Sequence, residues 1–107
     1  MDIKNKFFRT YLIKVKTPKG VFWYGGKHES FHENPYLDRY IGSGKILWNI
    51  YRKYGFNHRI KWSKCNGSRE KAYSEEISLI KALRLKHPQQ CINISPGGQG
   101  GEGILWN

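Results

Sequence analysis

Apolar and polar positions near the start of the chain follow the pattern of two strands. Residues 7–15 (FFRTYLIKV) and 21–25 (VFWYG) are rich in β-branched and aromatic side chains, which favour strands. The residues between them, KTPKG, contain a proline followed by a glycine, as turns commonly do. We therefore expect an antiparallel hairpin, followed by an irregular segment over residues 26–44, which contains Pro35 and three glycines.

The next two segments predict a helix and a strand. Residues 45–55 (KILWNIYRKYG) have the spacing of an amphipathic helix, and Gly55 is expected to end it. Residues 58–65 (HRIKWSKC) alternate with a period of two, which predicts a third strand. The apolar stripe expected for the helix consists of Ile46, Leu47, Ile50, Tyr51 and Tyr54.

A second helix is predicted after the sequence NGS. Ser68 can cap its first turn, which carries Glu70, and Pro88 ends the helix soon after Lys86. Its buried face is expected to consist of Tyr73, Ile77, Ile80 and Leu83.

The order β-β-α-β-α indicates the α/β (α+β) class, with a small three-stranded antiparallel sheet flanked by helices. A chain of 107 residues is expected to form one domain over residues 1–107, and its glycine-rich tail NISPGGQGGEG to close over one face. No apolar run approaches the roughly 18 residues of a membrane span, and the N-terminus lacks the features of a signal peptide. Cys65 and Cys91 have no close spacing, so we expect reduced thiols in a cytosolic protein.

Charge is the strongest signal in the composition. Nineteen Lys and Arg against eight Asp and Glu give a net charge of +11, and the basic residues are interleaved with four Trp and seven Tyr. A disordered basic arm lacks such aromatic residues, so these charges belong to a folded domain. The expected partner is a polyanion, with nucleic acid as the first candidate; the alternative is that the charge serves solubility alone.

The segment HESFH has the spacing of a zinc-protease motif. His28 and His32 would be metal ligands, Glu29 the general base, and Asp38 stands where some such proteases have a third ligand. Both imidazoles must then lie on one face of a rigid helix. Two glycines precede the segment and Pro35 follows it closely, which leaves barely two turns. A zinc metalloprotease is therefore a remote alternative.

The segment YIGSGK at residues 40–45 contains part of a second motif, the phosphate-binding P-loop. That motif requires a glycine where this chain has Arg39, and a hydroxyl where it has Ile46. The P-loop is therefore excluded.

Six blocks in order resemble a GIY-YIG endonuclease domain, specifically the phage-type, free-standing homing endonuclease branch. They cover nearly the whole chain and are YLIKV, WYGGKHES, YIGSGKILWNIYRKYG, REKAYSEEISLI, CIN and the final GGQGG. In this family the two signature tyrosines lie on adjacent strands of one hairpin, which matches Tyr11 and Tyr24. The literal YIG that contains Tyr40 is too far along the chain, and Arg9 and Thr10 occupy the positions before the first signature tyrosine.

The resemblance implies a metal-dependent DNA endonuclease that hydrolyses phosphodiester bonds by nicking or double-strand cutting, encoded by a phage and acting in the cytoplasm of a bacterial host. It also implies one Mg²⁺ or Mn²⁺ held by a single helical glutamate. Glu76 fits this role better than Glu75, because it shares the inward face of its helix. The alternative is a nucleic-acid-binding module of the same fold that has lost activity. Homing-type members of this family usually carry additional DNA-binding modules, and none is expected after Asn107. Target preference is therefore expected to come from the domain itself, from a partner or from a homodimer, or to be weak.

The resemblance also assigns roles to individual side chains. One of the signature tyrosines, with Tyr11 preferred, would position or deprotonate the attacking water, which requires nearby cations to lower the pKa of the phenol. Lys14, Lys27 and Lys45 are the candidates for that effect. His28 would share proton transfer or bind phosphate, and Asn93 would orient the glutamate or a tyrosine.

The remaining expected contacts are with DNA phosphate. Arg39 is the nearest substitute for an arginine that other branches of the family carry on a helix, and Lys45 or Arg52 could replace it. Gly42 and Gly44 would free the backbone so that Ser43 caps the first helix, whose amides would form a phosphate seat. The expected DNA-binding residues are Lys27, Ser43, Lys45 and Arg52.

Overall fold

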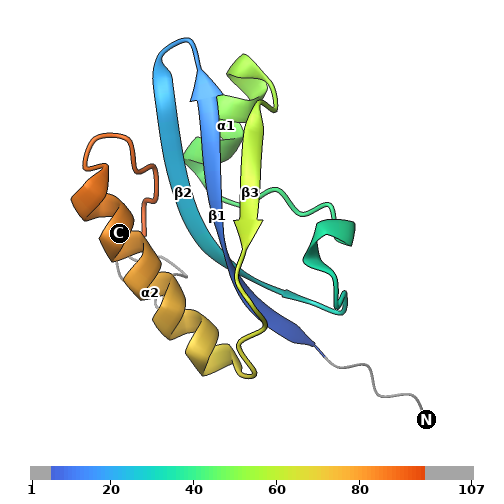
Figure 1. Ribbon diagram of the computed structural model, residues 1–107. Helices are drawn as coiled ribbons and strands as arrows, with labels where there is room; N and C mark the ends of the chain where they lie inside the picture. Colours follow the sequence, from blue (N-terminus) through green and yellow to red (C-terminus); the bar gives the residue numbers. More distant parts are fainter. Residues whose placement is uncertain (1–5, 96–107) are drawn as a thin grey trace.

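The computed structural model describes residues 6–95, which form a three-stranded sheet, two α-helices and a short 3-10 helix (Figure 1). The α+β class and the order β-β-α-β-α are confirmed. The elements are β1 (Phe7–Thr17), β2 (Gly20–Ser30), the 3-10 helix (Pro35–Leu37), α1 (Lys45–Tyr54), β3 (His58–Trp62) and α2 (Arg69–Lys86).

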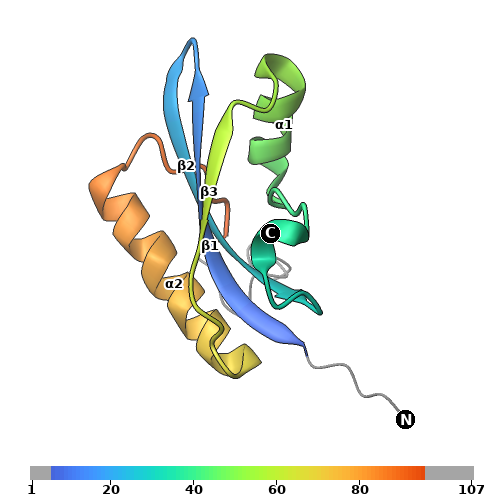
Figure 2. The same cartoon turned by 45° about the vertical axis from the view of Figure 1, so that its right-hand side comes forward.

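The sheet has the order β2-β1-β3, and the central strand β1 is antiparallel to both neighbours. Tyr11 lies opposite Gly26 on β2 and Trp62 on β3. Residues directly opposite one another point to the same side of a sheet, and successive residues of one strand point to opposite sides. The face with Tyr11 is called the tyrosine face, and the other, which carries Lys14 and Lys16 of β1, the lysine face. Figure 2 shows α1 on one side of the sheet and α2 on the other.

The core lies between the tyrosine face and α1. Ile13 and Val15 of β1 are fully buried there, together with Leu47 and Tyr51 of α1. Gly55 follows α1 with φ of +88°, so the predicted end of this helix is confirmed. Two expectations for α1 are wrong. Ile46 is exposed rather than part of the buried stripe, and the N-cap residue is Gly44, not Ser43, so no side chain caps the helix.

Helix α2 packs against β2 and β1 on the lysine face. Its predicted cap is confirmed, because Ser68 Oγ accepts a hydrogen bond from the backbone N–H of Lys71 at 3.2 Å. Gly25 leaves space for the helix, since a Cβ at that position would lie 2.9 Å from the Leu79 side chain. The expected burial of Ile80 and Leu83 is confirmed, but that of Ile77 is wrong, because this residue is 44% exposed. Ala72 is buried in addition.

Strand β2 is longer than the sequence indicates. Residues 26–30 were expected to be irregular, but they pair with residues 7–11 of β1. Gly26 is required there, because a Cβ would lie within 3.0 Å of the Tyr11 ring. Strand β3 is shorter than expected and ends at Trp62. Beyond it the pairing continues irregularly, with Ser63 and Thr10 joined by two hydrogen bonds.

The segment after α2 returns to the outer strand β2. Trp23 N–H donates to the carbonyl of Gln90 at 2.8 Å, and Trp23 C=O accepts from Ile92 N–H at 2.9 Å. The glycine-rich tail beyond Ser95, including GGQGG, lies outside the described residues. Cys65 and Cys91 are free thiols. Neither α1 nor α2, the α-helices of the described part, has the length and apolarity that crossing a bilayer requires.

An ion pair joins β2 to the start of α2 and leads to a pH-dependent prediction. Glu29 accepts hydrogen bonds from Arg69 Nε at 2.6 Å and Nη2 at 2.9 Å, and Lys6 lies 3.7 Å away. The hydrogen bond from Arg69 lowers the pKa of Glu29. The pair therefore stabilises the fold above the pKa of a glutamate in the unfolded chain, and this stabilisation is lost as pH falls through the lowered pKa.

We expect Glu29→Gln to lower the free energy of unfolding by about 1 kcal/mol at neutral pH, because the pair lies near the surface. The difference from the parent should become smaller at about pH 3, because the carboxylate takes up a proton first in the unfolded chain and then, at its lowered pKa, in the folded chain. Urea unfolding at the two pH values measures it. Glu75→Gln, which alters an exposed glutamate without an ion pair among residues 6–95, should change little. A difference for Glu29→Gln that persists unchanged at pH 3 would contradict the role of its charge.

Candidate functional site

Tyr11 is the centre of an aromatic cluster on the tyrosine face. It is only 2% exposed, and its ring centroid lies 5.2 Å from that of Trp62, 5.4 Å from Tyr40 and 6.1 Å from Tyr24. The hydroxyls of Tyr11 and Tyr40 are 3.4 Å apart. The structure thus brings together the two tyrosines that the sequence singled out, and it adds Tyr40.

Two glycines make room for the signature tyrosines. Gly26 lies against the ring of Tyr11, and Gly44 lies against the ring of Tyr24, so that a Cβ at either position would fall within 3.0 Å of the ring. At positions 26 and 44, the side chain of any residue other than glycine would occupy the space that these two rings fill. The glycines therefore determine where the two tyrosine hydroxyls lie.

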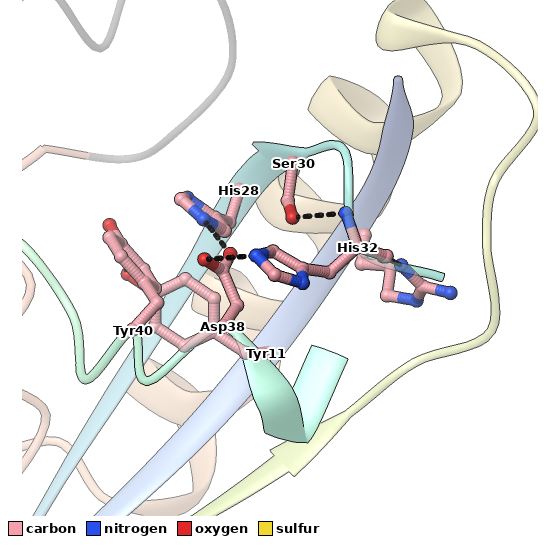
Figure 3. A network of polar contacts seen from close by, with 7 residues as sticks. Tyr11, His28, Ser30, His32, Asp38 and Tyr40 are labelled. Carbon is pink, nitrogen blue, oxygen red and sulfur yellow. Dashed lines mark hydrogen bonds and ion pairs between the residues drawn. The ribbon is translucent and has the colours of Figure 1, made fainter. Parts of the chain in front are cut away.

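A histidine pair and a carboxylate extend the cluster (Figure 3). Asp38 lies between two imidazoles: its Oδ2 is 2.6 Å from His28 Nε2, and its Oδ1 is 3.7 Å from His32 Nε2. The ring of His28 stacks on that of Tyr40, with centroids 3.7 Å apart and planes 12° from parallel. His28 is thereby fixed on one side by Asp38 and on the other by Tyr40.

A buried arginine supports the loop that carries this network. Arg9 is 8% exposed and donates hydrogen bonds to the carbonyls of His32, at 3.2 Å, and Glu33. It occupies a position where the GIY-YIG signature has a glycine. Its guanidinium holds the chain that leads from β2 to the 3-10 helix.

The electrostatics of the tyrosines differ from the expectation. Burial raises the pKa of Tyr11 well above its ordinary value, and the neighbouring Tyr40 and Tyr24 add to the rise. The expected lowering by nearby lysines is wrong. Lys14 and Lys27 lie on the lysine face, on the other side of the sheet. Tyr11 is therefore a protonated hydroxyl at neutral pH, which can donate a hydrogen bond.

Tyr24 is influenced by two of the other predicted site residues. Burial raises its pKa, a hydrogen bond with Ser43 opposes the rise, and the charge of Glu76 adds to it. Ser43, from the segment before α1, thus contacts the Tyr24 hydroxyl, while Glu76 of α2 acts on it only through its charge. The structure brings Ser43 into the site and places Glu76 within electrostatic range of it.

Lys27 and Asn93 have contacts within the protein. The Nζ of Lys27 lies 4.3 Å from the ring centroid of Tyr73, on α2. Asn93 pairs with the backbone of Gly25: its Oδ1 accepts from the N–H at 3.0 Å, and its Nδ2 donates to the C=O at 2.6 Å. The amide thus continues the pairing along β2 and fixes the strand next to Tyr24, rather than orienting a carboxylate or a phenol.

The three remaining predicted residues are exposed. Arg39 has φ of +56°, a conformation that is uncommon for a residue with a Cβ. Lys45 begins α1, and Arg52 donates a hydrogen bond to Asn49 Oδ1 at 2.6 Å on the same helix. All three side chains are accessible to a ligand but do not join the buried cluster.

The zinc-protease alternative is wrong. Residues 28–30 are strand rather than helix, so His28 and Glu29 point to opposite faces of the sheet, and Glu29 is bound to Arg69. His28 and His32 meet at Asp38 instead of at a shared metal position. Within residues 6–95, no three His, Cys, Asp or Glu side chains are arranged to hold a metal ion.

Tyr40 and Trp62 are the members of the cluster that sequence reasoning missed. Tyr40 was set aside because it lies beyond the hairpin, yet the loop from residue 31 to residue 44 returns it to Tyr11. Trp62 lies at the end of β3, opposite Tyr11. The period-two alternation of the predicted third strand was the available signal, because such an alternation places Trp62 on the same face as Ile60.

Comparison with known proteins identifies a relative from a phage. A protein of Enterobacteria phage T4 named "DNA replication protein" is 74% identical to this chain over 106 residues. These residues are 99% of this chain and 27% of that protein, so the chain spans about a quarter of the length of this relative. No protein-family model matches the chain, and no solved structure matches it significantly. The homing-endonuclease function expected from the sequence is contradicted, because this relative is named for DNA replication.

Proposed function

We propose that this domain binds DNA as part of a phage DNA replication protein. The observation that carries the proposal is the 74% identity, over 106 residues, to a protein named for DNA replication. At this identity, the side chains that determine a surface are largely shared. A domain that covers 27% of the relative would supply DNA binding to a longer protein rather than its whole activity.

The charge distribution supports binding to a polyanion. The net charge is +11, and the chain contains no Asp or Glu between Asp38 and Glu70. Elements α1 and β3 both come from this stretch, so basic side chains there have no acidic neighbours along the chain. Its basic residues are Arg39, Lys45, Arg52, Lys53, Arg59, Lys61, Lys64 and Arg69.

The tyrosine face supports contact with phosphate. Burial raises the pKa of Tyr11 and of Tyr24, so both phenols are protonated at neutral pH. Tyr11 is buried, and Tyr24, which is only partly buried, is the one of the two that can donate to a phosphate oxygen. Ser43 lies beside them, and α1 begins next to it with no side-chain cap. The free backbone N–H groups of that first turn, together with Lys45, favour an anion.

The proposal predicts salt-dependent binding to DNA. Fluorescence anisotropy with a labelled duplex should show an association constant that falls as salt rises, with a log–log slope of about −0.9 for each phosphate contacted. For about four contacts, raising the salt from 50 to 200 mM should weaken binding by roughly 100-fold. A second duplex of unrelated sequence serves as the control for base readout. Absence of binding at 50 mM salt, or binding that salt does not affect, would contradict the proposal.

The GIY-YIG resemblance and the hydrolase chemistry that it implies stay predictions. Glu76 would provide the single carboxylate that a hard cation such as Mg²⁺ or Mn²⁺ accepts, within electrostatic range of the hydroxyl of Tyr24. The cation would neutralise charge on a bound phosphate. Formation of a homodimer is a further prediction, which sedimentation of the chain with and without DNA would test.

A further inference from the structure

A pocket at the end of the sheet where β3 begins combines cations of the lysine face with Asn57 and His58, and the tyrosine site does not use it. It measures about 360 Å³ and is lined by Lys14, Lys16, Asn57, His58 and Arg59. We call it the basic pocket. Lys14 and Lys16 come from β1, and the other three residues come from the start of β3 and the residue before it.

The pairing of the strands concentrates positive charge in this pocket. Lys14 lies directly opposite Arg59 across β1 and β3, and Lys16 follows Lys14 by two residues on the same face. Like charges directly opposite one another destabilise a sheet. The fold therefore holds these cations together at a cost, which a bound anion would remove.

Acidic residues do not neutralise the pocket. Strands β1 and β3 contain no Asp or Glu, and no ion pair among residues 6–95 involves Lys14, Lys16 or Arg59. The position of Lys14 is nevertheless defined, because its Nζ lies 5.4 Å from the ring centroid of Trp23. Trp23 is stacked on His87 in turn, with centroids 4.5 Å apart.

The described part of the chain leaves the pocket accessible. Helix α2 packs on β2 and β1 near Gly25, and in Figure 2 it leaves the upper end of the sheet, at the β1–β2 turn, uncovered. Its C-terminal end reaches Trp23 through His87 and so borders the pocket beside Lys14. Lys16 and Arg59 are exposed, and Lys14 is half-buried.

We propose that the basic pocket is a second DNA contact, which binds the phosphodiester backbone on the side of the sheet opposite the tyrosine cluster. The proposal rests on the DNA binding proposed above and adds a location to it. Its recognition is electrostatic, through two ammonium groups and a guanidinium, so it should depend on salt and not on base sequence.

The test compares two triple variants of equal charge. The pocket variant is Lys14→Gln, Lys16→Gln, Arg59→Gln. The control variant, Lys71→Gln, Lys81→Gln, Lys86→Gln, removes three exposed cations of α2 outside the pocket. In the anisotropy assay, the pocket variant should bind both duplexes roughly 10- to 100-fold more weakly than the parent, with a salt slope smaller by about 2 to 3. The control should weaken binding less than about threefold. Thermal unfolding establishes that both variants are folded.

The outcomes separate this inference from the proposed function. If the parent binds DNA and the two variants weaken it equally, only net charge matters and the pocket proposal is overturned, while DNA binding stands. If the parent does not bind DNA, both fail. NMR chemical shifts of the backbone amides locate the contact independently. Addition of a duplex should shift the amide signals of Lys14, Lys16 and Arg59. If inorganic phosphate or a nucleoside triphosphate moves the same signals at equal or lower concentration, the pocket is a nucleotide site and the backbone proposal is overturned.

Discussion

Tyr11→Ala is expected to lower the free energy of unfolding by about 3–5 kcal/mol, which is typical for removing a buried aromatic side chain. Tyr11 is 2% exposed and contacts the rings of Tyr24, Tyr40 and Trp62, so its loss leaves a cavity at the centre of the tyrosine face. A domain of this size is stable by about 5–15 kcal/mol, so the loss is a large part of the total. Urea unfolding followed by tryptophan fluorescence measures it.

Tyr11→Phe is the matched control, because it keeps the ring and removes only the hydroxyl. The Tyr11–Tyr40 hydroxyl distance of 3.4 Å is long for a hydrogen bond, so we expect a loss of about 0.5–1 kcal/mol. Burial raises the pKa of Tyr11 in the folded state, so the neutral phenol stabilises the fold below about pH 10, and this contribution is lost as pH rises through the raised pKa. Tyr11→Phe should therefore lose less stability than the parent in strong alkali. Equal losses for Phe and Ala at neutral pH would contradict the role of ring packing.

Gly42→Ala is the second substitution with a large expected effect, about 2–5 kcal/mol. Gly42 has φ of +99°, which costs a residue with a Cβ about 1–2 kcal/mol. The added Cβ would also collide with the side chain of Leu47 and lie 3.1 Å from Ile13 Cδ1. Both neighbours are fully buried and cannot move away, and such overpacking costs about 1–3 kcal/mol more.

Gly67→Ala separates the cost of the backbone conformation from the cost of the collision with Leu47. Gly67 has φ of +78°, but a Cβ there would meet no atom within 4 Å, so only the cost of the backbone conformation, about 1–2 kcal/mol, remains. Urea unfolding of the two variants gives the difference. If both lose the same amount, the proposed collision with Leu47 is wrong. Because Trp48 Nε1 donates to the Gly42 carbonyl at 2.8 Å, Gly42→Ala should also disturb the neighbouring Tyr40 and Ser43.

Elements with local signals were predictable from the sequence. Gly55 ended α1 and Ser68 capped α2 as expected, since both effects depend on residues within one turn. The second half of β2 was not predictable in this way. Residues 26–30 are mostly polar and follow two glycines, and they form a strand because residues 7–11 of β1 pair with them. Their conformation depends on tertiary pairing rather than on local preference.

The site was predictable only where two residues share a regular element. Tyr11 and Tyr24 lie on one hairpin, so their proximity followed from the expected pairing of its strands. Tyr40 and Asp38 depend on the path of an irregular loop, which Arg9 holds through the carbonyl of His32. The pKa shifts of the tyrosines depend on burial and on the face that each lysine occupies. Neither the burial of a tyrosine nor the face of the sheet on which a lysine lies can be derived from the number of charged residues in the sequence.

The position of β3 has a consequence for contacts between copies of this chain. It is an outer strand of the described sheet, only five residues long, and its exposed positions include Arg59 and Lys61. Outer strands have unpaired backbone groups to which another chain can add, and short length and basic side chains oppose this. Two copies aligned through β3 would place four cations together. This strand therefore protects the protein against edge-to-edge aggregation.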